Sequence, residues 1–298
     1  MNAADVSGAV FDCIMENIHV LRHNVIAAMR DRASVNSAAI NNLNQIFPSL
    51  IDVTCFSHTL DRVGQNFQLP NALEFVNTWI SLFSHSFKAR IAFREQTGLD
   101  VKLLSKTRWW SRWEVIKQVV ELFPDVHGFI AAQRELSPAT VRKLLVMLDT
   151  PQIRNLVQVQ MAAVVDAGEV FVKATYHLEG DGPLSLVAYR VIKGIQAHFD
   201  MGHFPHLTAL CQRLYPDNEQ HQQQLVEYGK QCVQPGYQHF LKKFVGTDGQ
   251  PAEFEREMAF FKMAGLLHPH TMADKRPTTG EFVASLPNQP AFAPLSGE

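Results

Sequence analysis

The first hundred residues alternate between helical and strand-like hydrophobic patterns. Apolar residues recur at three- and four-residue steps over 4–18 and 34–47, which predicts two amphipathic helices. The short apolar runs "NVIAAM" (24–29) and "SLIDVTC" (49–55) are typical of buried strands, and the helical stretch "HTLDRVGQNF" follows the second run. This order of strand, helix, strand and helix is typical of an α/β unit with parallel strands.

After about residue 100 the strand pattern disappears and helical patterns remain. Ser111 and Glu114 have the spacing of a capping box, which predicts a helix that begins at Ser111. Ser137 and Thr150 each precede a proline, the usual order at a helix start. We expect further helices over four ranges: 151–178, 183–199, 217–233 and 235–245. The fold class predicted from these patterns is therefore α-rich α/β.

Composition and charge exclude several classes of protein. A hydrophobic content of 46% with 19% charged residues is typical of a globular chain rather than a disordered one. The net charge of −2 indicates no general affinity for polyanions, so any nucleic-acid surface has to be local. The four irregularly spaced cysteines suit a reducing compartment. Since no secretory signal pattern and no membrane-spanning apolar run occur, we expect an intracellular protein without a membrane partner.

Asp31 follows the first predicted strand directly. Open α/β sheets place functional groups at the carboxyl ends of their strands. A carboxylate at that edge can bind Mg²⁺, although a hard divalent ion needs further oxygen ligands. In "RDRAS" the same aspartate can instead cap the helix that follows, and from the local sequence alone capping is the favoured interpretation.

Cys55 and His58 have the spacing of half a zinc site, "CFSH". A structural zinc ion needs four ligands, and no second pair lies at a finger-like distance. His203, His206 and Cys211 form a loose cluster further along the chain. A strand-end thiol at Cys55 is therefore favoured over a zinc ligand.

The segment "VKLLSKTRWWSRWEVIK" (101–117) combines basic and aromatic residues and contains three of the four tryptophans of the chain. Basic groups neutralise phosphates, and indole rings stack on unpaired bases. Its candidate DNA-binding residues are Lys102, Lys106, Arg108, Trp109 and Arg112. We expect Trp113 and Ile116 to be buried core residues, and Trp109 to be partly exposed.

Taken together, "MRDRASVN", "CFSHTLDRVGQNF" and "TRWWSRWEV" resemble, in order and spacing, the middle of hAT-superfamily transposases. That family has an RNase H-like fold that a large helical insertion interrupts. A further segment, "MAGLLHPHTM" (263–272), resembles a stretch near the end of that insertion. The resemblance covers most of residues 20–285 and is strongest up to about residue 125.

The resemblance implies roles for individual residues. Asp31 matches the second acid of the DDE triad, so the resemblance implies that it is a metal-binding carboxylate. An intact family enzyme uses Mg²⁺ or Mn²⁺ as its cofactor, but with only one of the three acids present we expect no cofactor for this chain. Cys55 and His58 match the C/DxxH motif. Arg108 and Trp109 match the RW pair, whose tryptophan is associated with a flipped base at the transposon end. The resemblance also implies a nuclear protein with DNA as its partner and with a homo-oligomer as a further possibility.

The sequence departs from the family pattern at the other two acids. Asp5 and Asp12 belong to a helical stretch rather than to an earlier strand, and the surroundings of Glu281 do not resemble the third acid's context. We therefore expect an internal fragment of such a transposase with an incomplete triad and no strand transfer. Its expected parts are a partial RNase H-like α/β element at 1–100, a helical insertion domain at 101–290 and a disordered tail at 291–298. The alternative function is a protein–protein interaction module or an inert transposon remnant.

Overall fold

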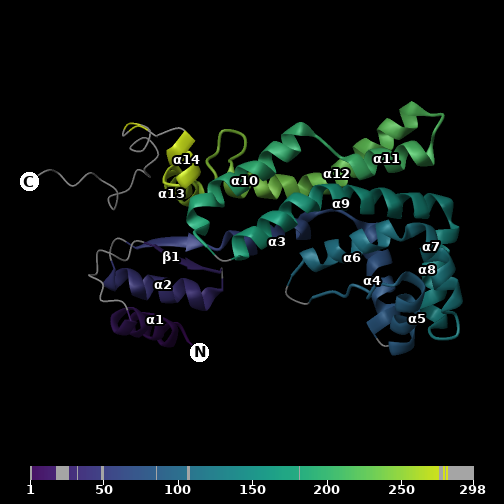
Figure 1. Cartoon of the computed structure of the whole chain (residues 1–298), viewed down its shortest axis with the longest axis horizontal. Coiled ribbons are helices and arrows are strands. Elements are labelled where there is room, and N and C mark those ends of the chain that lie inside the picture. The colour runs from purple at the N-terminus through teal and green to yellow at the C-terminus, as the bar shows by residue number, and fades with distance from the viewer. Residues whose placement is uncertain are drawn as a thin grey trace, which may run out of the picture. The chain divides into compact units, whose positions relative to one another are not determined.

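The computed structural model describes residues 2–17, 27–31, 33–47, 50–84, 86–105, 108–180, 182–274, 278 and 280. Over these residues the protein is mainly helical, with one two-stranded parallel sheet (Figure 1). Its elements in chain order are α1 (Ala3–Asn17), β1 (Ala27–Arg30), α2 (Ser34–Ile46), β2 (Ile51–Thr54), α3 (Phe56–Val63), η2 (Gly64–Asn66), α4 (Pro70–Ser84), α5 (Phe87–Thr97), α6 (Trp110–Glu121), α7 (Phe123–Ala132), α8 (Pro138–Asp149), α9 (Pro151–Glu179), α10 (Leu184–Met201), α11 (Pro205–Leu214), α12 (Glu219–Phe244), α13 (Glu255–Leu266) and α14 (Pro269–Asp274).

The α-rich α/β class predicted from the sequence is confirmed, because two parallel strands flank α2 and helices make up most of the rest. The predicted strand residues 24–26 and 49 lie outside the described residues, as do Glu281 and the predicted tail at 291–298. The two helices predicted on either side of residue 234 are one helix, α12, with Pro235 inside it. Cys232, Val233 and Phe240 are buried on both sides of this proline, and their packing outweighs the loss of one helical hydrogen bond.

The described chain forms two compact units. The first contains 1–59, 175–192 and 244–298, and the second contains 60–174 and 193–243. A boundary thus lies between Thr59 and Leu60, whereas the sequence suggested one near residue 100. The division into an RNase H-like element and an insertion domain stays a prediction.

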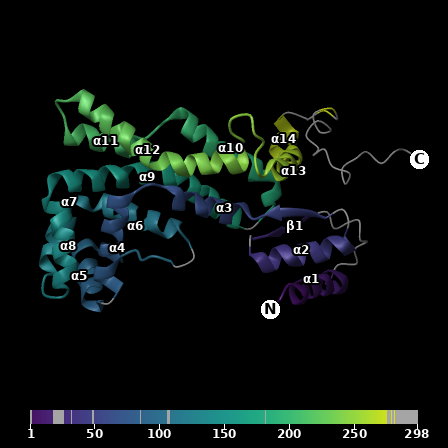
Figure 2. The same cartoon turned by 180° about the vertical axis from the view of Figure 1, so that it is seen from behind.

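In the first unit, α2 lies between α1 and the sheet, as Figures 1 and 2 both show. The strands pair in parallel from Ala27 opposite Ile51 to Arg30 opposite Thr54, and α2 provides the crossover that a parallel pair requires. Buried apolar residues on α2 and in the connection to β2 pack against α1; they are Ile40, Leu43, Phe47 and Leu50, with Phe11 and Ile14 of α1 against them. This core fixes the direction of both strands.

A second cluster of the first unit surrounds Phe56, the first residue of α3. Its ring lies 4.9 Å from that of Phe244 and 5.0 Å from that of Phe261 in edge-on contacts, and 5.7 Å from that of Phe254 in a stacked one. Edge-on and offset-stacked pairs are the favoured aromatic geometries. The cluster therefore attaches the start of α3 to α13 and to the end of α12.

The second unit has an aromatic core between α4, α5 and α7. Trp79 and Phe83 of α4 contact Phe93 of α5 and Phe129 of α7, with ring centroids 4.9–6.0 Å apart within this group. Elsewhere in this unit α9 lies beside α12, where Gly229 brings the backbone of α12 close to Leu207 and Ala163. Among the described residues, no helix is both long and apolar enough to cross a bilayer.

Three helices of the second unit begin at a buried polar side chain of another helix. Asp61 of α3 accepts from the N–H groups at the start of α6, and Gln160 of α9 does so at the start of α4. Asp166 of α9 accepts from the backbone N–H groups of His206 and Leu207 in α11. The first four N–H groups of a helix lack helical partners, so these side chains satisfy groups that would otherwise be buried without one.

The second unit also contains a half-buried histidine, His198 of α10, whose Nε2 atom is buried without a hydrogen-bond partner. Burial lowers the pKa of His198, with a further lowering from His203, against opposing effects of Asp166 and Glu169. Because the folded-state pKa lies below the unfolded value of about 6.5, the neutral imidazole contributes stability that is present above pH 6.5 and lost as pH falls through the folded pKa.

We therefore predict that the free energy of unfolding falls as pH decreases from 7 to 5 and that His198→Phe makes this decrease smaller. Urea denaturation at a series of pH values measures it. His177→Gln, at an exposed position at the end of α9, is the matched control and is expected to leave the slope unchanged. Identical pH slopes for wild type and His198→Phe would contradict the prediction.

Candidate nucleic-acid interface and strand-end carboxylate

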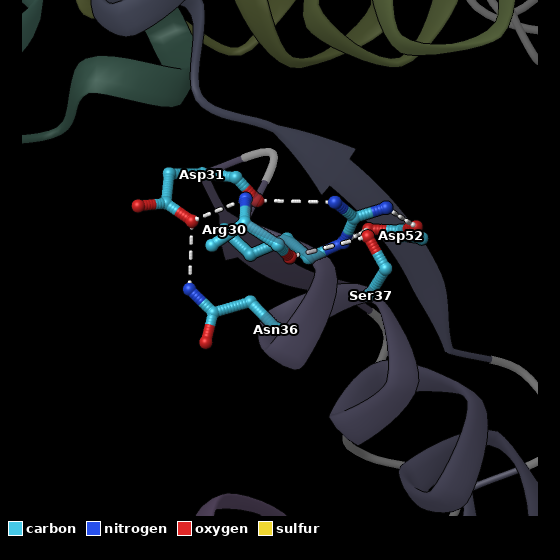
Figure 3. Close-up of polar contacts among 6 residues, drawn as sticks. Arg30, Asp31, Asn36, Ser37 and Asp52 are labelled. Atoms are coloured by element: carbon cyan, nitrogen blue, oxygen red, sulfur yellow. Dashed lines mark hydrogen bonds and ion pairs between the residues drawn. The ribbon is translucent and has the colours of Figure 1, made fainter. Parts of the chain in front are cut away.

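Asp31 is exposed and lies directly after β1, at the carboxyl end of the sheet (Figure 3). Its Oδ1 atom accepts from the backbone N–H of Ala33 at 2.9 Å and from Nδ2 of Asn36 at 2.7 Å. These two hydrogen bonds, the Ala33 one first, lower the pKa of Asp31, and His58 and Arg30 lower it further. The carboxylate therefore holds the turn from β1 into α2, which agrees with the capping interpretation of "RDRAS", although the N-cap residue itself is Ala33.

A bidentate ion pair fixes the same strand ends. The Arg30 guanidinium donates through Nε to Oδ1 of Asp52 at 2.9 Å and through Nη2 to Oδ2 at 2.6 Å, and through Nη1 to the carbonyl oxygen of Asp31 at 3.0 Å (Figure 3). Arg30 and Asp52 come from adjacent strands. Paired parallel hydrogen bonds of this kind fix orientation as well as distance. The backbone of Asp31 is therefore held from both strands.

Cys55 and His58 lie at the same end of the sheet as Asp31, because Cys55 N–H donates to the Arg30 carbonyl at 2.7 Å and continues the ladder. Cys55 is half-buried, with its Sγ atom 3.1 Å from the Oγ atom of Ser57. The structure thus brings the predicted acid and the predicted CxxH motif together in the first unit. Within the described residues no group of three or more histidine, cysteine or carboxylate side chains could hold a metal ion.

The loose cluster of His203, His206 and Cys211 belongs to the second unit. His206 Nδ1 lies 2.6 Å from Oδ1 of the buried Asp166. Cys211 is fully buried, and burial raises the pKa of its thiol to about 11. His206 and Cys211 therefore serve the packing of α11 in this unit, whereas His203 is exposed and precedes that helix.

The basic segment at 101–117 lies in the second unit and has an uneven exposure. Lys102 and Arg108 are exposed, and Arg112 is half-buried with its Nη1 atom donating to Oδ1 of Asn77 at 3.0 Å. Lys106 lies outside the described residues. Gln118 fixes the start of the segment by accepting from the Lys102 N–H and donating to the Asp100 carbonyl, at 2.8 and 2.9 Å.

The three tryptophans differ in burial, and Trp109, Trp113 and Ile116 have the exposure predicted for them. Trp110 and Trp113 are buried, at 3% and 8% exposure, and Ile116 is fully buried, whereas Trp109 is half-buried. The indole N–H of Trp113 donates to the Val165 carbonyl at 3.1 Å. Trp113 is therefore a core residue, and Trp109 is the tryptophan of this segment that offers partly exposed surface.

Trp109 is also packed on one side. A β-carbon at Gly64 would lie 2.0 Å from the Trp109 ring, so the indole lies directly on the backbone of η2. The rings of Phe67 and Trp110 contact it edge-on, at centroid distances of 5.5 and 4.9 Å. The indole is thus held in one position, and the residue keeps part of its surface exposed.

The capping box predicted at Ser111 and Glu114 is wrong. Helix α6 begins at Trp110, so Ser111 lies inside its first turn, where its hydroxyl donates to the Arg108 carbonyl at 2.8 Å. The N–H groups of Trp109 and Trp110 are capped instead by the Asp61 carboxylate, at 3.1 and 3.3 Å. N–H groups at the start of a helix have no carbonyl acceptor within that helix, and Asp61 on α3 provides the acceptor for these two.

Comparison of the chain with known protein families, characterised proteins and solved structures finds no match. The geometry of the two sites is therefore the basis for any functional conclusion.

Sequence reasoning missed Asp61, Gly64, Gln118, Gln160 and Asp166. All of these except Gly64 are polar residues that are buried within helices, at positions where apolar residues are usual. The signal is present in "VQVQMAAVVDAGEV", where glutamine, aspartate and glutamate interrupt an otherwise apolar stretch of helix. Buried polar groups are normally hydrogen-bonded, so such interruptions indicate a specific partner even though the sequence does not identify it.

We predict that Asp61→Ala lowers the free energy of unfolding by about 1.5–3 kcal/mol, the usual range for hydrogen bonds to a charged group. The reason is that two N–H groups at the start of α6 lose their acceptor. Chemical denaturation monitored by tryptophan fluorescence measures this. Arg62→Ala, at the exposed neighbouring position, is the control and is expected to stay within about 0.5 kcal/mol of wild type. Equal, small effects of both substitutions would show that the cap is not formed.

Proposed function

We propose that this chain derives from a hAT-superfamily transposase and binds distorted or unpaired DNA through the start of α6. In this proposal β1, α2 and β2 are part of an RNase H-like element, and the contact residues are Lys102, Arg108, Trp109 and Arg112. Such a protein would act on DNA in the nucleus.

The observation that carries the proposal is the combination of a fixed indole and adjacent cationic side chains. Trp109 is held by Gly64 and by the Asp61 cap, and it keeps part of its surface exposed. Arg108 is exposed at the preceding position. A stacking residue has to offer free ring surface, and a neighbouring cation neutralises the phosphate of the stacked nucleotide. Because the Trp109 ring is already held in position, less side-chain conformational entropy is lost when DNA binds.

The proposal assigns no strand cleavage to Asp31. Two-metal phosphoryl transfer needs several carboxylates around the ions, and the Asp31 Oδ1 atom is already engaged by Ala33 and Asn36. The carboxylate is therefore assigned a structural role in the turn before α2. DNA cleavage in Mg²⁺ or Mn²⁺ that Asp31→Ala abolishes would contradict this assignment.

We predict that Trp109→Ala weakens binding to hairpin or single-stranded DNA by about 1–3 kcal/mol, because one base loses its stacking partner. Arg108→Ala is expected to weaken binding to all sequences and to reduce the slope of log K against log salt by about 1, since one phosphate contact is lost. Fluorescence anisotropy at several salt concentrations measures both effects.

The matched control is Arg142→Ala, which removes an exposed arginine from α8 in the same unit. It is expected to change neither the affinity nor the salt slope. Salt-independent binding, or equal effects of the Arg108 and Arg142 substitutions, would contradict a specific phosphate contact at α6.

A second candidate function is that of a protein–protein interaction module. Phe87 and Ile91 lie one turn apart on α5 and are 75% and 41% exposed. Large exposed apolar residues grouped in this way mark interaction surfaces. The DNA-binding measurement separates the two candidates, because an interaction module of this kind needs no affinity for DNA.

A further inference from the structure

A cavity in the second unit lies between α6, α7, α9 and α11 and includes none of the proposed DNA contacts. Its volume is about 190 Å³. A second hollow of about 500 Å³ adjoins it and shares Val120, Phe123, Gln158 and Arg213 with it. The smaller cavity is the candidate ligand site, and the larger hollow lies beside it.

The wall of the smaller cavity is mainly apolar. Val120, Phe123, Met161 and Leu210 contribute side chains from four helices. Met161 is fully buried, and Leu210 is 7% exposed. An apolar cavity of about 150 Å³ in another protein binds benzene, so a cavity of this volume is large enough for a single aromatic ring.

One buried polar group, Gln158 of α9, lines both the cavity and the hollow. It is only 8% exposed, and its side-chain amide makes no hydrogen bond within the part of the chain that the structure describes. By contrast Gln160, two residues further along α9, accepts from two N–H groups and donates to the Tyr228 hydroxyl. The Gln158 amide therefore has donor and acceptor capacity that it does not use within the described chain, and a polar group of a ligand could take it up.

Cationic side chains lie at the same opening. Arg213, in the last turn of α11, lines both spaces, and Arg154 lines the larger one; neither makes an ion pair among the described residues. His206 lines the smaller cavity and is fixed by Asp166 through Nδ1. One acid, Glu121, lines the larger hollow. Arginine binds carboxylates through two parallel hydrogen bonds, so a ligand with a single carboxylate suits this opening.

We propose that this cavity binds a small aromatic carboxylic acid. The ring occupies the apolar recess between Phe123, Met161 and Leu210. The carboxylate lies at the opening, where it accepts from the Arg213 guanidinium and from the Gln158 amide. This inference does not depend on the proposed DNA binding, since none of these residues belongs to the segment at 101–117.

Phenylacetate is the probe, and isothermal titration calorimetry with the full chain is the measurement. We expect saturable binding with one site per chain. Its neutral isostere phenylacetamide is expected to bind about tenfold more weakly, because it loses the charge-assisted hydrogen bonds to Arg213. Arg213→Gln and Gln158→Leu are each expected to weaken phenylacetate binding by about tenfold for the same reason.

Two further variants make the test specific. Ala209→Phe, at an exposed position of the cavity wall, fills the space and is expected to abolish binding while circular dichroism shows the helices intact. Arg142→Gln removes an equivalent charge away from the cavity and is expected to leave the affinity unchanged. The proposal is overturned if wild type shows no saturable binding, if the acid and the amide bind equally, or if the Arg213 and Arg142 substitutions have the same effect.

Discussion

The arrangement of the second unit depends on hydrogen bonds from the first N–H groups of a helix to a buried side chain of another helix. Asp61, Gln160 and Asp166 are 2%, 0% and 3% exposed, and each accepts from two such N–H groups. A helix end that is buried without an acceptor is unfavourable, and a buried carboxylate without a donor is equally so. Each contact satisfies both partners and thereby fixes where one helix starts against another.

Helix α9 carries two of these three acceptors and is the element that joins the unit together. Gln160 holds the start of α4, and Asp166 holds the start of α11. Gly168 allows the Trp113 indole to lie on the α9 backbone, where a β-carbon would be 2.3 Å from the ring. These contacts are directional, whereas apolar packing alone tolerates sliding of one helix along another. The third acceptor, Asp61, sets the position of Trp109 and so connects the framework to the proposed DNA contact.

The sequence predicts the elements better than their connections. Strands β1 and β2 and helices α1, α2, α8, α9 and α10 follow directly from periodicity and from proline at helix starts. The break expected before Pro235 is absent because buried neighbours outweigh the local preference of proline. Periodicity reports which face of a helix is apolar, but it does not report which distant residue accepts a hydrogen bond from its first turn.

The same limit applies to the candidate sites. The exposure of Trp109 and the burial of Trp113 were predictable from their positions before and within α6. The Asp61 cap was not predictable. The spacing of Ser111 and Glu114 indicated a capping box within the segment itself, so no acceptor from another helix was expected. The cavity beside Gln158 arises from four separate helices, so no single stretch of sequence contains it.

Amide hydrogen exchange measured by NMR tests the importance of these caps most directly. If the caps hold these helix starts, the N–H groups of Trp110, Ala72 and Leu207 exchange only in openings that approach global unfolding. The N–H groups of Ala139 and Thr140 at the start of α8, a helix whose N-cap residue makes no side-chain hydrogen bond, are the internal reference and are expected to exchange by local fraying. Exchange of all five N–H groups at the same fast rate would show that the caps do not hold these helix starts.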